Sequence, residues 1–236
     1  TPTFNPTAGA INYAEGATTA VDSFTITDTD TTGTLACAEG GADASKFSCS
    51  ISGSTLTVSW DASPDFETQT DADSNGVYVY TITVGDGTNN ANAVTYTITV
   101  TDVVIDISAA SATIDETASN GAAVVTLSST GDSATAAGFT ISAGNANGAF
   151  AVTSGGAVTV ADTSAIDYET ATSQTVTFTI TDGSNAVTEN VVISFNNNAI
   201  AITGSQTASI AENTGSGTEI MTVATTGDSM AGNSWQ

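Results

Sequence analysis

The sequence has almost no positive charge. Its 236 residues include one lysine, Lys46, no arginine and no histidine, against 25 acidic residues, so the formal net charge is −24. With a single cationic side chain the protein cannot neutralise a phosphate backbone or an anionic membrane surface, which argues against nucleic-acid and membrane-surface partners. Without imidazole it also lacks the usual general base and the histidine ligands of zinc enzymes. What remains are functions that acidic and neutral groups can perform.

Long hydrophobic runs are missing as well. No segment approaches the ~20 apolar residues that a membrane-spanning helix requires, so no membrane insertion is expected. Hydrophobic residues still make up 40% of the chain, enough for packed cores despite the charge. The sequence starts at Thr1 without an initiator methionine or a secretory leader, which indicates a mature chain or a segment of a longer one.

Cysteine is scarce, with Cys37 and Cys49 on either side of a Gly40-Gly41 turn. Placed on adjacent strands, the two would form a disulfide, which fits an exported protein. The alternative is a pair of reduced cysteines packed as small apolar residues. The even number favours the disulfide and, with it, an extracellular or cell-surface location.

What the chain does contain is a repeated order of short acidic motifs. Glutamates at Glu15, Glu116 and Glu212 recur at intervals of about 100 residues, the size of a whole β-sandwich domain. The first two are each followed by an Asp-aromatic-Glu triplet, Asp65-Phe66-Glu67 and Asp167-Tyr168-Glu169. This repetition predicts three segments: repeat one at 1–102, repeat two at 103–197, and the first strands of a third at 198–236.

Period-two alternation predicts strands throughout. Between 77 and 84, Tyr78, Tyr80 and Ile82 alternate with residues that are mostly smaller or hydroxylated, and Gly, Asn, Asp and Ser clusters separate such runs. No stretch shows a sustained helical period. The sequence therefore predicts an all-β fold with Phe66 and Tyr168 as core residues.

The third segment carries strand patterns at about 207–211 and 219–224 and then stops. Fewer than 40 residues cannot bury an independent core. Two interpretations are open: the natural chain continues beyond Gln236, which we favour, or these strands complete a sandwich with another chain by β-augmentation.

Taken in order, these motifs resemble bacterial cadherin-like repeats. The resemblance rests on Pro64-Asp65-Phe66-Glu67, on Tyr80 to Gly87 and on Thr97 to Asp102, with matching segments at Ile166 to Thr170 and Thr179 to Gly183. It implies tandem Greek-key β-sandwiches of the cadherin or immunoglobulin-like type, with about seven strands in each repeat.

The resemblance also implies Ca²⁺ at the domain boundaries, where six to eight oxygen ligands must converge. For the first boundary it implies Glu15, Asp65, Glu67, Asp102, Asp132 and Asp182. For an upstream boundary it implies Asp28, Asp30 and Asp86. For the second it implies Glu116, Asp167, Glu169 and Asp228.

The sequence departs from the family pattern at both linkers. The first reads Asp102-Val103-Val104-Ile105-Asp106, with apolar residues in place of two oxygen donors, and the second, Asn196-Asn197-Asn198, carries amides in place of acids. We therefore expect fewer ions at the first boundary than a full site holds and a weaker second site. The alternative roles of these acids are loop capping, hydrogen bonding to backbone amides, or solubility alone.

The function that these features favour is a calcium-rigidified extracellular spacer or adhesion module of a large bacterial surface or secreted adhesin. Its partners would be other copies or neighbouring repeats, with a cell-surface glycan or protein in addition. The alternatives are a subunit of an extracellular filament or surface layer that docks through the partial third repeat, and a phage virion fibre or decoration module. An enzyme is not expected, because the carboxylate pairs occur once per repeat with no aromatic-rich cleft between them.

Overall fold

The computed structural model of the chain describes residues 1–4, 9–29, 33–108 and 110–227. By their internal contacts the residues form two compact units, Thr1–Val104 with Asp182–Asn185, and Ile105–Thr181 with Ala186–Gln236. Within the described ranges the helical segments are two short 3-10 turns, η1 (Ala44–Lys46) and η2 (Thr163–Ala165). No helix in these ranges is long and apolar enough to cross a membrane. The all-β prediction is confirmed.

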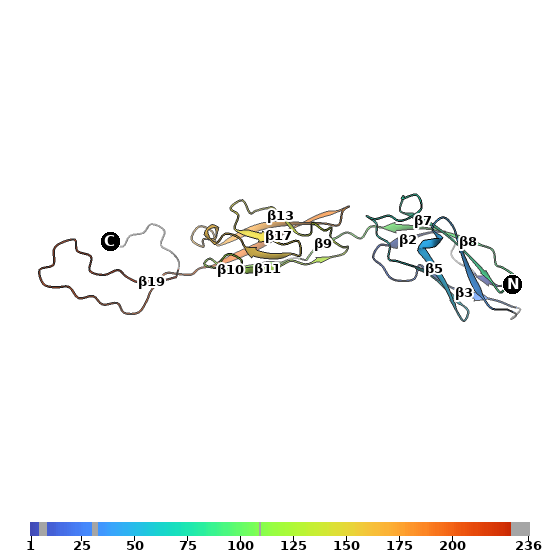
Figure 1. The fold of residues 1–236 in the computed structure, drawn as a ribbon, viewed down its shortest axis with the longest axis horizontal. Helices are drawn as coiled ribbons and strands as arrows, with labels where there is room; N and C mark the ends of the chain where they lie inside the picture. The colour runs from blue at the N-terminus through green and yellow to red at the C-terminus, as the bar shows by residue number, and fades with distance from the viewer. Residues whose placement is uncertain (5–8, 30–32, 109, 228–236) are drawn as a thin grey trace. The chain divides into compact units, whose positions relative to one another are not determined.

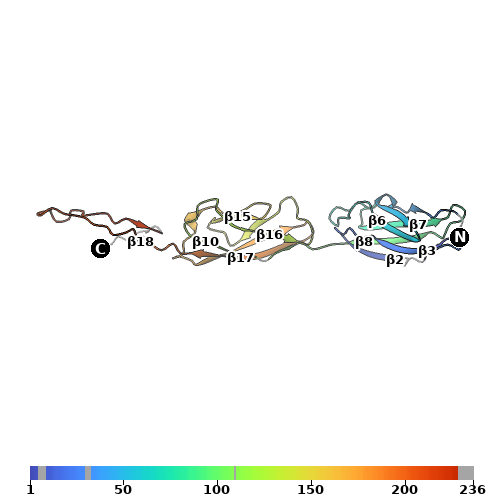
Figure 2. The same cartoon turned by 90° about the horizontal axis from the view of Figure 1, so that it is seen from below.

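The first sandwich encloses its core between two four-stranded sheets (Figures 1 and 2). One sheet has the order β1 (Thr3–Phe4), β3 (Asp22–Thr27), β6 (Thr55–Trp60) and β5 (Phe47–Ser52). The other has the order β2 (Gly9–Ala14), β8 (Val94–Thr101), β7 (Val77–Gly85) and β4 (Ala36–Gly40). Strand β2 runs parallel to β8, and the remaining pairs are antiparallel.

Aromatic side chains fill much of this core. Along β7 the predicted alternation holds, because Tyr78, Tyr80 and Ile82 are all buried. Phe47 lies 4.3 Å from the Trp60 ring and 4.8 Å from the Tyr80 ring, centroid to centroid. Alternate residues of a strand face one side of its sheet, so the sequence pattern alone placed these rings inside.

The two cysteines form a disulfide, as predicted, but not between neighbouring strands of one sheet. Cys37 lies on β4 and Cys49 on β5, which belong to opposite sheets. The chain passes through η1 between these strands and so moves from one sheet to the other. The bond therefore ties the two layers of the first sandwich together.

The second sandwich has a similar arrangement, with a longer closing strand β17 and shorter strands in its other sheet. One sheet has the order β10 (Ser111–Asp115), β17 (Ala186–Asn196), β16 (Ser173–Thr181) and β13 (Thr140–Ala143), with β10 parallel to β17. The other has the order β11 (Ala123–Thr126), β15 (Ala157–Val160) and β14 (Phe150–Val152). A separate pair joins β12 (Ser129–Thr130) to β9 (Asp106–Ile107). Neighbours that are not consecutive in sequence give both sandwiches the crossovers of Greek-key folds.

Branched aliphatic residues and phenylalanine fill the second core. Val176, Phe178 and Ile180 of β16 are at most 1% exposed, as are Val191 and Ile193 of β17. Tyr168 packs against this cluster from its edge, as predicted for a core residue, and Phe66 does so in the first sandwich. The alternation expected for these strands is therefore confirmed.

The third segment is poorly covered by protein. Between residues 198 and 227 its strands are β18 (Ala201–Ile202) and β19 (Thr225–Thr226), and residues 203–224 form an open loop between them (Figure 1). The strands predicted at 207–211 and 219–224 are wrong, because both stretches lie in that loop. Ile202, Ile210 and Ile220 are 60%, 56% and 59% exposed. Alternation gives a strand no stability when no second layer covers its apolar face.

Candidate metal centre

A buried glutamate organises the candidate centre of the first sandwich. Glu15 lies just after β2 and is only 4% exposed. Its Oε2 accepts a hydrogen bond from the amide of Phe66 at 2.6 Å, and its Oε1 accepts one from the amide of Val103 at 2.7 Å. One carboxylate thus holds both the Asp-Phe-Glu loop and the segment that follows β8, and these bonds offset the cost of burying its charge.

Two more carboxylates converge on Glu15. One oxygen from each of Glu15, Glu67 and Asp102 lies within 4.8 Å of the others. The Oδ1 atom of Asp102 is buried and has no hydrogen-bond partner among the described residues. A buried carboxylate oxygen without a donor, next to two other carboxylates, is electrostatically unfavourable unless a proton or a cation is present.

The second sandwich repeats the glutamate arrangement. Glu116 follows β10 and is 4% exposed. Its Oε2 accepts a hydrogen bond from the amide of Tyr168 at 2.8 Å, and its Oε1 accepts one from the amide of Asn198. In each sandwich, the aromatic residue of the triplet therefore has two roles. Its ring packs against the core, and its backbone amide donates a hydrogen bond to the buried glutamate.

The second triad differs in composition. It consists of Glu116, Asp167 and Glu169, with one oxygen from each within 4.8 Å of the others. Residue Asn197, from the linker, donates its Nδ2 to Glu169 Oε1 at 2.8 Å. A neutral amide thus stands beside this triad, whereas the linker of the first sandwich contributes the carboxylate of Asp102.

The triplet aspartates also shape their own loops. Asp65 Oδ1 accepts the amide of Thr68 at 2.8 Å, and Asp65 is not part of the first triad. In the second sandwich the hydroxyl and the amide of Thr170 both donate hydrogen bonds to Asp167. These bonds, the hydroxyl bond most strongly, lower the pKa of Asp167 below its usual value. Loop capping, the alternative role expected from the sequence, is therefore present beside any metal role.

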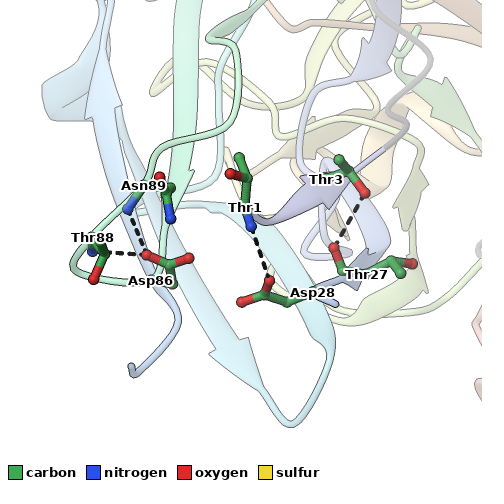
Figure 3. Close-up of polar contacts among 7 residues, drawn as sticks. All are labelled: Thr1, Thr3, Thr27, Asp28, Asp86, Thr88 and Asn89. Carbon is green, nitrogen blue, oxygen red and sulfur yellow. Dashed lines mark hydrogen bonds and ion pairs between the residues drawn. The ribbon is translucent and has the colours of Figure 1, made fainter. Parts of the chain in front are cut away.

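Two of the predicted residues cap hairpins. Asp86 and Asp182 are 2% and 6% exposed, and each accepts hydrogen bonds at Oδ1 from the amides two and three residues further on. Figure 3 shows this cap at Asp86, in the turn between β7 and β8. The Asp-Gly signal therefore has a local structural cause in both repeats.

The other predicted residues lie outside the triads. Asp28 follows β3, and its Oδ1 lies 3.5 Å from the N-terminal nitrogen of Thr1 (Figure 3). Asp132 is half-buried in the loop after β12. Asp30 and Asp228 lie outside the described residues. Of the described acids predicted as ligands, those that the structure gathers into groups of three are thus the two triads, each inside its own unit.

A buried pair of aspartates was missed by the sequence reasoning. Asp43 accepts the amides of Ala72 and Val79, both at 2.7 Å, and so fastens the loop before β7. Asp71 is 5% exposed, and its burial raises its pKa. The hydrogen bonds that it accepts, first that from the Asn75 amide, lower the pKa by more than burial raises it, so the pKa of Asp71 lies below its usual value. The spacing Asp71-x-Asp73-x-Asn75-Gly76 was the available signal, and it builds a turn whose Ser74 has φ 56°.

The donor chemistry of the triads fits a hard divalent cation. All the side-chain donors are carboxylate oxygens, the type that calcium and magnesium prefer, and no thiol or imidazole is near them to favour a softer metal. Three protein ligands leave several coordination positions to water or to other oxygens. The residues present therefore fit calcium, with the first triad offering the buried Asp102 oxygen that lacks a donor.

Comparison with known proteins gives structural neighbours alone. No protein-family model matches the sequence, and no curated protein matches it. The chain is similar to human protocadherin-24 EC1-2, at 17% identity over 83% of this chain and 97% of that chain, with a TM-score of 0.36. It is also similar to protocadherin gammaB7 EC3-6, at 17% identity over 96% of this chain and 60% of that chain, with a TM-score of 0.38. A third neighbour is the protocadherin gammaB4 extracellular domain, at 18% identity over 96% of this chain and 40% of that chain, with a TM-score of 0.39.

Proposed function

We propose that the chain is a calcium-rigidified extracellular spacer or adhesion module of a bacterial surface or secreted adhesin. The observation that carries the proposal is the repeated triad, in which a buried glutamate and two further carboxylates converge in a chain with one side-chain cation. Carboxylates this close repel one another, and a bound cation removes that repulsion. We propose no catalytic role.

Binding at the triad would stiffen the chain between domains. Glu15 holds the amide of Val103, and Glu116 holds that of Asn198, so each glutamate already fixes the first residue or two beyond its closing strand. An ion on the same glutamate would lock this attachment. The other ligands that belong to the proposal are Asp65, Asp132 and Asp182 for the first boundary and Asp28, Asp30 and Asp86 for an upstream one.

An extracellular setting agrees with this chemistry. Weak extracellular calcium sites have dissociation constants of about 10⁻⁴ to 10⁻³ M. The disulfide between the sheets is of the kind that persists in oxidising compartments. Both features suit a module that meets millimolar calcium outside the cell.

Thermal melts with calcium and with chelator test the proposal. At about 10 mM calcium, a site with a dissociation constant of about 1 mM adds ~1.4 kcal/mol, and one of about 0.1 mM adds ~2.7 kcal/mol. Glu67→Gln should reduce the gain, whereas Glu189→Gln, which removes one charge on β17 away from both triads, should not. Identical melts with and without calcium, and no metal by elemental analysis, would reject the proposal.

The exposed third segment favours a second candidate, a subunit of a filament or surface layer. Apolar residues in this segment stand open to solvent, among them Ile202 and Ile210. Strands of another copy would cover them by β-augmentation. Fibres in the electron microscope formed by a chain of about 23 kDa would support polymerisation, whereas a native product several times longer with further repeats would support the spacer.

A further inference from the structure

A hollow of about 370 Å³ opens on the first sandwich, beside the end of β6 and the loop that follows it. Its floor includes the half-buried Trp60 and the buried Tyr78. Polar residues surround that floor, among them Lys46, Asp61 and Thr68. This volume lies at the lower end of the range for small-molecule sites.

The aromatic floor is held rigidly. The Trp60 ring lies 4.3 Å from Phe47, 4.8 Å from Tyr78 and 5.6 Å from Tyr13, centroid to centroid. The hydroxyl of Tyr78 in turn contacts Thr70 at 3.3 Å. Rings fixed in this way present a surface that loses little entropy when a ligand binds.

Three polar groups that line the hollow lack protein partners. Among the described residues, Trp60 Nε1 is buried without a hydrogen-bond acceptor. Lys46, the single side-chain cation of the sequence, has no carboxylate within 4.0 Å in the same part of the chain, and no hydrogen bond there reaches the Asp61 carboxylate. The hollow thus combines a cation and a carboxylate that the protein leaves unpaired, whereas the indole N–H beside them is itself buried.

The second sandwich provides a natural comparison. Its corresponding hollow, about 270 Å³, is lined by Asn147, Gln174 and Asp167 among others, with neither indole nor lysine. There the amides bond to the protein: Gln174 Nε2 donates to Gly144 O at 2.7 Å and to Asn147 Oδ1 at 3.0 Å. A hollow occurs in both sandwiches, whereas of the two hollows the first has the unpaired lysine and the indole ring.

We propose that the first hollow binds a neutral pyranose ring, as found at the end of or within a glycan. The exposed part of the Trp60 ring suits the C–H face of a sugar, and the sugar hydroxyls can accept a hydrogen bond from Lys46 and donate one to Asp61. A strongly anionic glycan is disfavoured by the net charge of −24. This activity goes beyond a spacer. The hollow is lined by Asp65 but by none of the three triad carboxylates, so we expect the sugar to bind without a metal at the triad.

Titration of ¹⁵N-labelled protein with methyl glycosides of glucose, galactose, mannose and N-acetylglucosamine tests the site. Trp235→Phe identifies the indole N–H signal of Trp60. With at least one glycoside we expect a saturable shift of that signal with a dissociation constant of about 1–10 mM, in the range of a single weak contact surface. Asp61→Asn, at an exposed position, should weaken binding at least fivefold.

Matched measurements separate this site from the metal centre. Glu189→Gln removes the same charge from the second sandwich and should leave the affinity unchanged, and chelator should leave it unchanged too. The proposal is overturned if no glycoside shifts the Trp60 signal at 100 mM. It is equally overturned if both Asp61→Asn and Lys46→Ala bind as the parent does, or if chelator abolishes the shift. The calcium melts are independent of each of these results.

Discussion

The two sandwiches share their backbone devices but differ in what fills and fastens them. In both, an early strand pairs in parallel with the last strand of the sandwich, β2 with β8 and β10 with β17. In both, a buried glutamate also holds the Asp-aromatic-Glu loop, and an aspartate caps the last hairpin. The first sandwich adds a disulfide between its sheets and a cluster of aromatic rings around Trp60. The second relies on valine, isoleucine and phenylalanine.

This difference separates what the fold requires from what each repeat adds. Hydrogen bonds to a buried carboxylate are needed wherever a loop must be fixed against a strand end, so they recur. Core composition is free as long as volume and alternation are kept. The aromatic cluster and the unsatisfied indole of the first sandwich are therefore the places to look for a function specific to that repeat.

The largest expected effect comes from removing a core ring in each sandwich. Phe178→Ala in the second and Phe47→Ala in the first should each cost about 3–5 kcal/mol. Hydrogen exchange read by mass spectrometry should show each loss of protection confined to its own unit, because each has a separate core. Loss of protection in both units from either variant would contradict the division.

The disulfide should come next. Cys37→Ser with Cys49→Ser removes a link with a sequence separation of 12 residues, for which chain entropy gives roughly 3 kcal/mol at most. Denaturant unfolding followed by hydrogen exchange should show a weaker first sandwich and an unchanged second one, which has no cysteine. Equal stability of the first sandwich after the double substitution would mean that its aromatic core alone sustains it.

Exchanging the linker residues sharpens the comparison of the two triads. Asp102→Asn should weaken calcium binding at the first triad about tenfold, and Asn197→Asp should strengthen calcium binding at the second triad by a similar factor. Each change corresponds to ~1.4 kcal/mol in binding free energy. Isothermal titration with calcium measures both changes. Thr117→Ser, beside Glu116 in sequence but outside the triad, should alter neither affinity. No change in either linker variant would remove the linker from the site.

The smallest effect at neutral pH concerns tyrosine. Burial, followed by the charge of Glu39, raises the pKa of Tyr80, and burial followed by Asp22 raises that of Tyr96. A raised pKa stabilises the fold below about pH 10, and this contribution is lost as the pH rises further, because the unfolded chain ionises first. Near-UV circular dichroism should show the first sandwich unfolding above pH 10. Tyr80→Phe should move that transition to higher pH, whereas an unmoved midpoint would exclude Tyr80 as its cause.

Much of the fold and part of the site followed from the residues. Alternation from Tyr78 to Ile82 predicted the buried face of β7, and the two glutamates and triplets contain five of the six acids that form the two clusters. The strands predicted near Ile210 and Ile220 are absent, because alternating apolar residues stabilise a strand only where a second layer covers their apolar face. Asp65 was expected with Glu67, yet it caps its loop through Thr68 outside the triad.

The sequence by itself determined the all-β class, the recurrence of the acidic motifs, the acidity and the carboxylate chemistry, because these depend on composition and on periodicity along the chain. Only the tertiary structure decided that Cys37 and Cys49 join opposite sheets, that Glu15 holds amides 51 and 88 residues away, and that Trp60 lines a hollow while its indole nitrogen is buried without an acceptor. Such contacts are set by how two sheets stack and where their loops meet. Residues distant in sequence carry no local signal of that meeting, so packing alone brings them together.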